Sequence, residues 1–208
     1  MNIFEKLYQE LEKKYGKPNE QWNLWCKRPK TIQEKEEVMM GAILTQRTSW
    51  KNVELSLKNL KNNHIISLKN IYLLGPKKIE AFIKPAGFYE QKAQYLFNLA
   101  QFFVEKYGSL KKFKKIGLEK MREEILKVKG VGPETADSIL LYALDQPIFV
   151  IDEYTKRLAN EKKLTDKMDY FSLQKLFENN LKKDFCLYQD FHALIVIYGK
   201  NKNLNKKI

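Results

Sequence analysis

Hydrophobic positions recur three and four residues apart along most of the chain, which is the spacing of one face of an α-helix. The clearest face joins Ala136, Ile139, Leu140, Ala143 and Leu144. Other stripes of this kind comprise Ile3, Leu7 and Leu11, then Val38, Met39, Ala42 and Ile43, then Val53, Leu57 and Leu60, then Ala93, Leu96, Phe97, Ala100 and Phe103, then Leu173, Leu176 and Phe177, and finally Ala193, Ile195, Val196 and Ile197. The pattern predicts an all-α fold.

One apolar segment has no helical period. IFVI, at 148–151, directly follows Pro147 and is too short for a helix of its own. Such a run is typical of a short buried strand, but a buried linker between helices would have the same composition. Both readings stay open on the sequence.

The charge balance indicates a polyanionic partner. The 208 residues include 38 Lys and Arg against 25 Asp and Glu, a net charge of +13. Such an excess favours nucleic acid, although many stable proteins are simply basic. No stretch has the length of a membrane span, and the first twenty residues lack the apolar core of a signal peptide. We therefore expect a cytoplasmic, nucleoid-associated protein with no membrane contact.

A turn with two glycines separates two predicted helices, over 121–128 and 133–144. Gly130 and Gly132 permit backbone conformations that a Cβ would obstruct, and Pro133 suits the first position of a helix. The free amides of the turn and helix start would form an anion nest. Such a pair of glycines is often an ordinary helix connection. With Lys129 beside it in a basic chain, we interpret it, together with the intervening Val131, as a main-chain grip on a DNA phosphate.

Asp152 follows the IFVI segment and precedes a helical pattern. The simplest reading is a helix N-cap, a position where aspartate is favoured. A carboxylate fixed there could also stabilise positive charge on a deoxyribose, as hydrolysis of an N-glycosidic bond requires. The two roles are compatible.

The segment VKGVGPETADSILLYALDQPIFVIDEYTKRL resembles the helix-hairpin-helix-GPD signature of the endonuclease III superfamily of DNA glycosylases. MMGAILTQRTSWKNVELSLKNL, PAGFYEQKAQYL and FHALIVIYGK are similar to further blocks of that family, in the same order. The most similar branch is that of the methylpurine glycosylases, including 3-methyladenine DNA glycosylase III. The resemblance implies two helical lobes with DNA across the cleft: residues 30–144, a barrel ending in the hairpin (about 121–144), and residues 1–29 with 145–208.

The resemblance places the family's catalytic aspartate at Asp152. Where bifunctional members carry a Schiff-base lysine, this chain has Glu134. Without an amine there, a monofunctional glycosylase that uses water is favoured. Two alternatives stay open: a bifunctional glycosylase/AP lyase acting on oxidised bases through another lysine, and a non-catalytic DNA-binding module that keeps the hairpin for structure.

A second departure from the family concerns cysteine. Many relatives end in four cysteines that hold an iron–sulfur cluster, whereas this chain has only Cys26 and Cys186, with none after Cys186. No iron–sulfur cluster and no other metal site is therefore expected. The resemblance leaves two small groups open: a monovalent cation in the hairpin turn and a carbamylated lysine, for which Lys200 is the matching residue. A lysine near a helix C-terminus, where the helix dipole favours it, is an equally open reading of Lys200.

Base flipping requires a side chain that fills the gap in the duplex and a pocket for the base. The resemblance places Gln46 at the inserted position, with Arg47 able to reach a phosphate or the unpaired base. Core packing is the default role of a tryptophan, but tryptophan faces attract cations, and alkylated purines such as 3-methyladenine are cationic. The base-pocket candidates are Trp22, Trp25, Trp50, Glu134 and Lys200.

The expected partner is double-stranded DNA with a damaged base. We expect the protein to bind it as a monomer. His192 is expected to pack or hydrogen-bond near the C-terminal helix.

Overall fold

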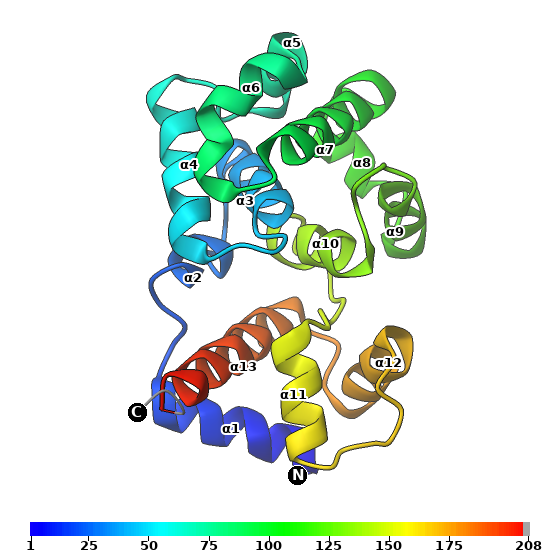
Figure 1. Ribbon diagram of the computed structural model, residues 1–208. Coiled ribbons are helices and arrows are strands. Elements are labelled where there is room, and N and C mark those ends of the chain that lie inside the picture. The colour runs from blue at the N-terminus through cyan, green and yellow to red at the C-terminus, as the bar shows by residue number, and fades with distance from the viewer. Residues whose placement is uncertain (206–208) are drawn as a thin grey trace. The chain divides into compact units, whose positions relative to one another are not determined.

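The computed structural model describes residues 1–205, and it is helical throughout (Figure 1). No strand occurs in the described part of the chain, so the prediction of an all-α fold is confirmed. The chain divides into two compact units. Residues 28–144 form the hairpin unit, and residues 1–27 with those from Asp145 onward form the terminal unit. The first division thus falls after Lys27 rather than at residue 30.

The hairpin unit is built around α3 (Ile32–Leu44). Every residue of α3 from Glu37 to Leu44 is buried, because α4, α7, α10 and the π-helical turn η3 all pack against it. A capping box, in which Thr31 and Glu34 bond each other's backbone N–H, starts this helix. The other elements of this unit are α4 (Trp50–Asn62), α5 (Leu68–Leu74), α6 (Pro76–Ile83), η1 (Lys84–Ala86), α7 (Tyr89–Gln101), η2 (Phe102–Tyr107), α8 (Leu110–Lys114), α9 (Leu118–Leu126), α10 (Pro133–Ser138) and η3 (Ile139–Ala143).

The terminal unit joins the two ends of the sequence. Its elements are α1 (Ile3–Tyr15), α2 (Trp22–Trp25), α11 (Glu153–Glu161), α12 (Tyr170–Asn180) and α13 (Phe185–Asn205), and both α1 and α11 pack on α13. Aromatic rings form its core. Phe149 stacks on Phe177 with ring centroids 4.5 Å apart, and Phe4 and Phe191 pack against the same cluster. Such ring pairs contribute beyond the area they bury.

The first predicted stripe was wrong at one position. Phe4, Leu7 and Leu11 are buried, whereas Ile3 is 51% exposed. Helix α1 begins at Ile3 after the N-cap Asn2, and neighbouring positions on a helix point about 100° apart. The face that contains Phe4 is turned inward, so Ile3 lies at its solvent edge.

The IFVI segment is a buried linker and not a strand. All four side chains are buried, but the backbone of Phe149 bonds side chains of α12 instead of a second strand. Its N–H donates to Glu178 Oε1 (2.8 Å), and its carbonyl accepts from Gln174 Nε2 (2.7 Å). Because every buried peptide group needs a partner, these two bonds allow extended chain to cross a helical core. The linker ends at Asp152 and anchors that residue.

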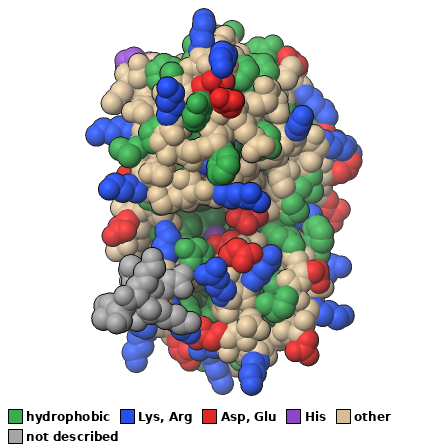
Figure 2. Space-filling model, viewed as in Figure 1, with side chains coloured by type: hydrophobic (Ala, Val, Ile, Leu, Met, Phe, Trp, Pro, Cys, Tyr) green, Lys and Arg blue, Asp and Glu red, His purple; other side chains and the backbone are tan. Residues whose placement is uncertain are grey.

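Within the described residues, no helix combines the length and the apolar character that crossing a membrane would require. On the face drawn in Figure 2, lysine and arginine side chains are spread over the surface and interspersed with acidic ones. Charge alone therefore does not locate a binding site on this face.

Candidate functional site

The predicted hairpin is present in the hairpin unit as α9, a tight turn and α10, which continues into η3. A bidentate ion pair holds the two helices together. Arg122 Nε donates to Asp137 Oδ1 at 2.7 Å, its second guanidinium nitrogen donates to Oδ2 at 3.0 Å, and Asp137 is completely buried. Two parallel bonds of this kind fix orientation as well as distance.

The two glycines of the turn differ in what they require. Gly130 has φ +99°, and a Cβ there would lie 2.2 Å from the Tyr95 ring of α7, so no other residue fits. Gly132 has φ −89°, and a Cβ on it would meet nothing within 4 Å. The prediction that both glycines avoid an obstruction is correct for Gly130 and wrong for Gly132. Neither the backbone conformation nor packing within the chain therefore requires glycine at position 132.

Side chains bind two carbonyls of the turn, and the amide of Val131 is used within the turn, donating to Val128 O at 3.0 Å, so the expectation of a free amide is wrong for Val131. Lys129 O accepts from Asn98 Nδ2 and Gly130 O accepts from Gln46 Nε2, both at 3.0 Å. The N-cap of α10 is Gly132, so no N-cap side chain satisfies the first N–H groups of this helix, and Pro133 occupies the first position. Unsatisfied amides and the positive end of the helix dipole make this turn suitable for an anion.

Gln46 and Arg47 lie in the connection between α3 and α4. Gln46 is half-buried, and its Nε2 donates to Gly130 O and, at 3.2 Å, to Thr135 Oγ1. The structure therefore brings Gln46 to the hairpin turn, a contact that the sequence had not indicated. Arg47 is exposed and adopts a left-handed backbone with φ 52°. Whether Gln46 inserts into DNA stays a prediction.

A buried lysine holds this connection beside a second exposed segment. Lys92 Nζ of α7 donates to Leu44 O and to Ala86 O, both at 2.8 Å, and burial lowers its pKa to about 8. Leu44 precedes the connection that contains Gln46, and Ala86 precedes Gly87 and Phe88. Phe88 is 63% exposed in a left-handed conformation, with φ 45°. An exposed aromatic residue in a strained backbone is a functional candidate, and its sequence signal was a phenylalanine directly after a Pro-Ala-Gly turn.

Asp152 is the N-cap of α11, as predicted from the sequence. Its Oδ1 accepts from Thr155 N (2.7 Å) and Thr155 Oγ1 (2.9 Å), and Oδ2 lies 3.6 Å from His192 Nε2. Burial by itself raises the pKa of Asp152, but the attraction of His192 and the hydrogen bonds from Thr155 outweigh it and hold the pKa below its usual value. The carboxylate is therefore ionised although only 14% of the side chain is exposed. Thr155 had not been singled out in the sequence.

Three of the base-pocket candidates belong to the terminal unit. Trp22 and Trp25 are buried and pack edge to face at 5.9 Å, and Trp22 also meets the ring of His192 at 6.0 Å. Lys200 Nζ, on α13, donates to Oε1 of Gln21, the residue before Trp22, at 2.9 Å. Burial lowers the pKa of Lys200 despite the attraction of Glu20 and Asp152. These candidates and Asp152 thus share one unit and one electrostatic environment.

The other two candidates belong to the hairpin unit. Trp50 begins α4 and is half-buried, and Glu134 is exposed in the first turn of α10. A carboxylate in that turn is favoured by the helix dipole. The chain therefore has Glu134, and no amine, at the helix start beside the proposed phosphate grip.

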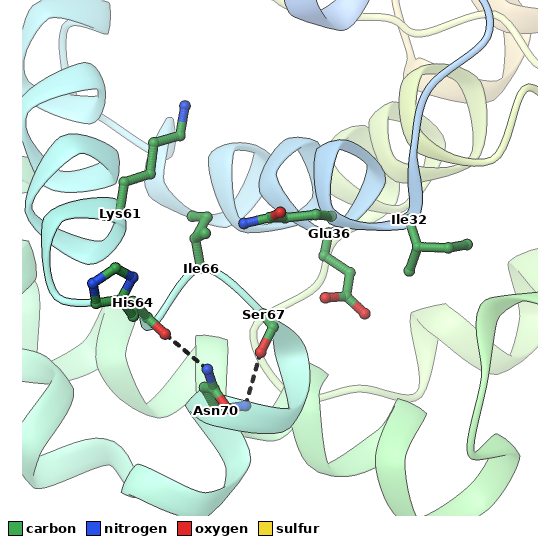
Figure 3. A pocket seen from close by; sticks show the side chains of 8 residues that line it. Ile32, Glu36, Lys61, His64, Ile66, Ser67 and Asn70 are labelled. Carbon is green, nitrogen blue, oxygen red and sulfur yellow. Dashed lines mark hydrogen bonds between the residues drawn. The ribbon is translucent and has the colours of Figure 1, made fainter.

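A separate cavity of about 610 Å³ lies in the hairpin unit, between the start of α3, the end of α4 and the start of α5 (Figure 3). None of the predicted site residues lines it. Its polar groups cap α5: Ser67 Oγ accepts from Asn70 N, and Asn70 Nδ2 donates to His64 O. These bonds give the cavity wall a structural role.

Cys26 and Cys186 are both half-buried, and neither forms a disulfide bond. Among the residues that the structure describes, no three His, Cys, Asp or Glu side chains come together as a metal site.

Comparison with known proteins identifies the family of this chain. The model of HhH-GPD superfamily base excision DNA repair proteins matches residues 40–183, which include Gln46, the hairpin and Asp152. The chain belongs to this superfamily. It is accordingly a DNA glycosylase.

Individual relatives agree with this assignment. The glycosylase is 42% identical to the Methanocaldococcus jannaschii protein named "Putative DNA repair glycosylase MJ1434", over 94% of this chain and 86% of that protein. It is 32% identical to the H. pylori 3-methyladenine DNA glycosylase MagIII, solved with 1,N6-ethenoadenine, with a TM-score of 0.78 over 97% of this chain and 99% of that one. A trapped endonuclease III–DNA intermediate shares the fold, with a TM-score of 0.73 at 16% identity over 97% and 88% of the two chains.

Proposed function

We propose that this glycosylase removes an alkylated purine from double-stranded DNA by hydrolysis, with Asp152 as the catalytic carboxylate. The observation that carries the proposal is the ionised carboxylate of Asp152, fixed by Thr155 at the start of α11 and largely shielded from water. Charge in a poorly solvated site acts on developing charge more strongly than it does in water. The 32% identity to MagIII over nearly the whole of both chains supports the choice of an alkylated purine.

In the proposed reaction, the bond between the sugar C1′ and the purine nitrogen breaks, and its electron pair leaves with the base. The sugar becomes oxocarbenium-like, and Asp152 stabilises its positive charge. Water adds to C1′ and loses a proton, which leaves an abasic site and a free base. A cationic alkylated purine departs as a neutral molecule, so no general acid is required.

DNA would be held by the hairpin turn and by nearby side chains. The amides of Gly130 and Gly132 would bind a phosphate at the turn that also contains Val131, whose own N–H donates to Val128 O, and the exposed Lys129 would add charge. Gln46 would exchange its bonds to Gly130 O and Thr135 Oγ1 for contacts in the gap left by the base. The exposed Phe88, held beside this segment through Lys92, is suited to unstack a base step. We propose that the enzyme acts as a monomer.

Our candidates for contacts to the base stay Trp22, Trp25 and Lys200 in the terminal unit and, separately, Trp50 and Glu134 in the hairpin unit, because aromatic faces and carboxylates attract a cationic base. A neutral amine is the form that reacts with CO₂, and the lowered pKa of Lys200 supports carbamylation there, which NMR with ¹³C-bicarbonate would detect.

A monovalent cation in the hairpin turn would need carbonyl oxygens. Those of Lys129 and Gly130 each accept one N–H and keep a second lone pair, so the turn fits such an ion.

A panel of lesion-bearing duplexes tests the proposed function. Duplexes with 3-methyladenine, 1,N6-ethenoadenine, an oxidised pyrimidine or only normal bases would be incubated with enzyme in excess, and free base and strand breaks measured separately. We expect release of the alkylated purine, with strands that break only after alkali treatment. Release of the oxidised pyrimidine alone would contradict the substrate assignment, and DNA binding without base release would favour a binding module.

Borohydride trapping tests the hydrolytic mechanism. A lyase forms an imine between an enzyme amine and the sugar, which borohydride reduces to a stable adduct. Because Glu134 takes the place of a lysine, we expect no adduct on abasic DNA. Lys127 is an unsuitable substitute, since its Nζ bonds Glu123 (2.8 Å) and Glu124 (2.9 Å). Introducing Glu134→Lys provides a positive control, and an adduct with the unchanged enzyme would establish the lyase alternative.

A further inference from the structure

The two oxygens of Asp152 are held in different ways. Oδ1 accepts both the N–H and the hydroxyl of Thr155, as an N-cap does. Rotation about the bond to the carboxyl group is soft, so a second contact is needed to define where Oδ2 points. His192 Nε2, at 3.6 Å, is within ion-pair distance of Oδ2.

The imidazole of His192 is itself confined. It lies on α13, is 5% exposed, and meets Trp22 at 6.0 Å and Phe149 at 6.4 Å, both nearly perpendicular to it. Phe149 belongs to the linker that ends at Asp152, so one buried segment packs against the histidine and delivers the carboxylate. Because neighbouring rings hold the imidazole on two sides, it can hold the carboxylate oxygen that it contacts in a defined position.

We propose that His192 is a positioning residue for Asp152: it fixes the second carboxylate oxygen and keeps the carboxylate ionised inside the terminal unit. This inference rests on the proposed catalytic role of Asp152. Histidine suits the task because its ring can donate a hydrogen bond when neutral and adds a positive charge when protonated.

The charges around the pair determine what happens without His192. Tyr154 of α11 and Lys200 of α13 both interact electrostatically with Asp152, and Glu20 offsets the charge of Lys200. The influences that lower the pKa of Asp152 come from His192 and Thr155, and burial opposes them. Without the histidine, burial has less to oppose it, so the pKa of Asp152 should rise.

Single-turnover excision across pH tests the proposal with His192→Phe and His192→Gln. The reaction needs the ionised carboxylate, so its rate falls as pH decreases through the pKa of Asp152. We expect this acid limb to move to higher pH in both variants. His192→Phe should also slow excision at neutral pH roughly 10- to 100-fold, because the carboxylate is no longer oriented. His192→Gln keeps an N–H donor and should recover most of the neutral rate but not the acid limb.

Tyr188→Phe is the matched control. Tyr188 lies on the same buried part of α13, and its hydroxyl makes no hydrogen bond among the described residues. Removing that hydroxyl should leave rate and pH profile unchanged. If His192→Phe does not fold, the acid limb of the pH profile of His192→Gln tests the positioning role by itself. An unshifted acid limb in a folded His192 variant would overturn the positioning role. Full activity of Asp152→Asn would instead overturn the function on which it rests.

Discussion

Replacing Asp152 by asparagine is expected to reduce the single-turnover rate of base excision by about 10³-fold or more, since one preorganised electrostatic contact is typically worth 10²- to 10³-fold and this site relies on one carboxylate. Asparagine is nearly isosteric, and its carbonyl oxygen can still accept from Thr155 N, so α11 keeps its cap. The variant loses the negative charge that would stabilise the sugar. Rapid-quench measurement of abasic sites checks the rate, and binding to undamaged duplex should change less than about threefold.

Asp169→Asn is the control for this substitution. Asp169 caps α12 in the same unit, accepting from Ser172 N at 3.0 Å, and it is exposed. The same chemical change at a second N-cap should leave the excision rate unaltered. Near-normal turnover by Asp152→Asn on alkylated DNA, with the control behaving as described, would show that Asp152 is only a cap.

Alanine at the two glycines of the hairpin turn should give opposite phenotypes. Gly130→Ala adds a Cβ 2.2 Å from the Tyr95 ring on a backbone with φ +99°. Strain and overpacking each cost about 1–3 kcal/mol, so we expect roughly 2–5 kcal/mol of lost stability, visible as a markedly lower Tm. Gly132→Ala has ordinary φ and open space, so its free energy of unfolding should change by less than about 1 kcal/mol.

DNA affinity separates the two variants further. A methyl group at position 132 would stand where a phosphate approaches the turn amides, and loss of one such contact corresponds to roughly a tenfold weaker Kd. Calorimetric unfolding combined with fluorescence-anisotropy titration on the same preparations checks both expectations. A stable Gly132→Ala protein that binds duplex as tightly as the wild type would show that the turn does not grip the backbone. A Gly130→Ala protein with unchanged Tm would contradict the close packing on Tyr95.

Several site residues could be found in the sequence because their signals are local. A Gly-x-Gly-Pro turn between two amphipathic helices indicates the hairpin, and an aspartate before a helical stripe indicates an N-cap. Gly132 shows the limit of this reasoning. Both glycines look alike in the sequence, and only the position of Tyr95, thirty-five residues before Gly130, separates the one that packing requires from the one that it does not.

Partners far apart in the chain had no such signal. Gln46 meets Gly130 O across 84 residues, and Lys92 meets Leu44 O across 48. Asp152 and His192 are forty residues apart and on different helices, so neither spacing nor composition indicates their contact. The IFVI segment was ambiguous for the same reason, since the bonds from Glu178 and Gln174 decide between strand and linker.

By itself, the sequence determined the helical class, the basic charge, the hairpin turn, the N-cap aspartate and the absence of a lysine at position 134, because each depends on neighbouring residues or on residue type alone. The tertiary structure decided which glycine is obligatory, what holds Gln46, and which ring faces the second oxygen of Asp152. These depend on distances between side chains that meet only when the helices pack, and the periodicity of each helix does not specify its neighbour.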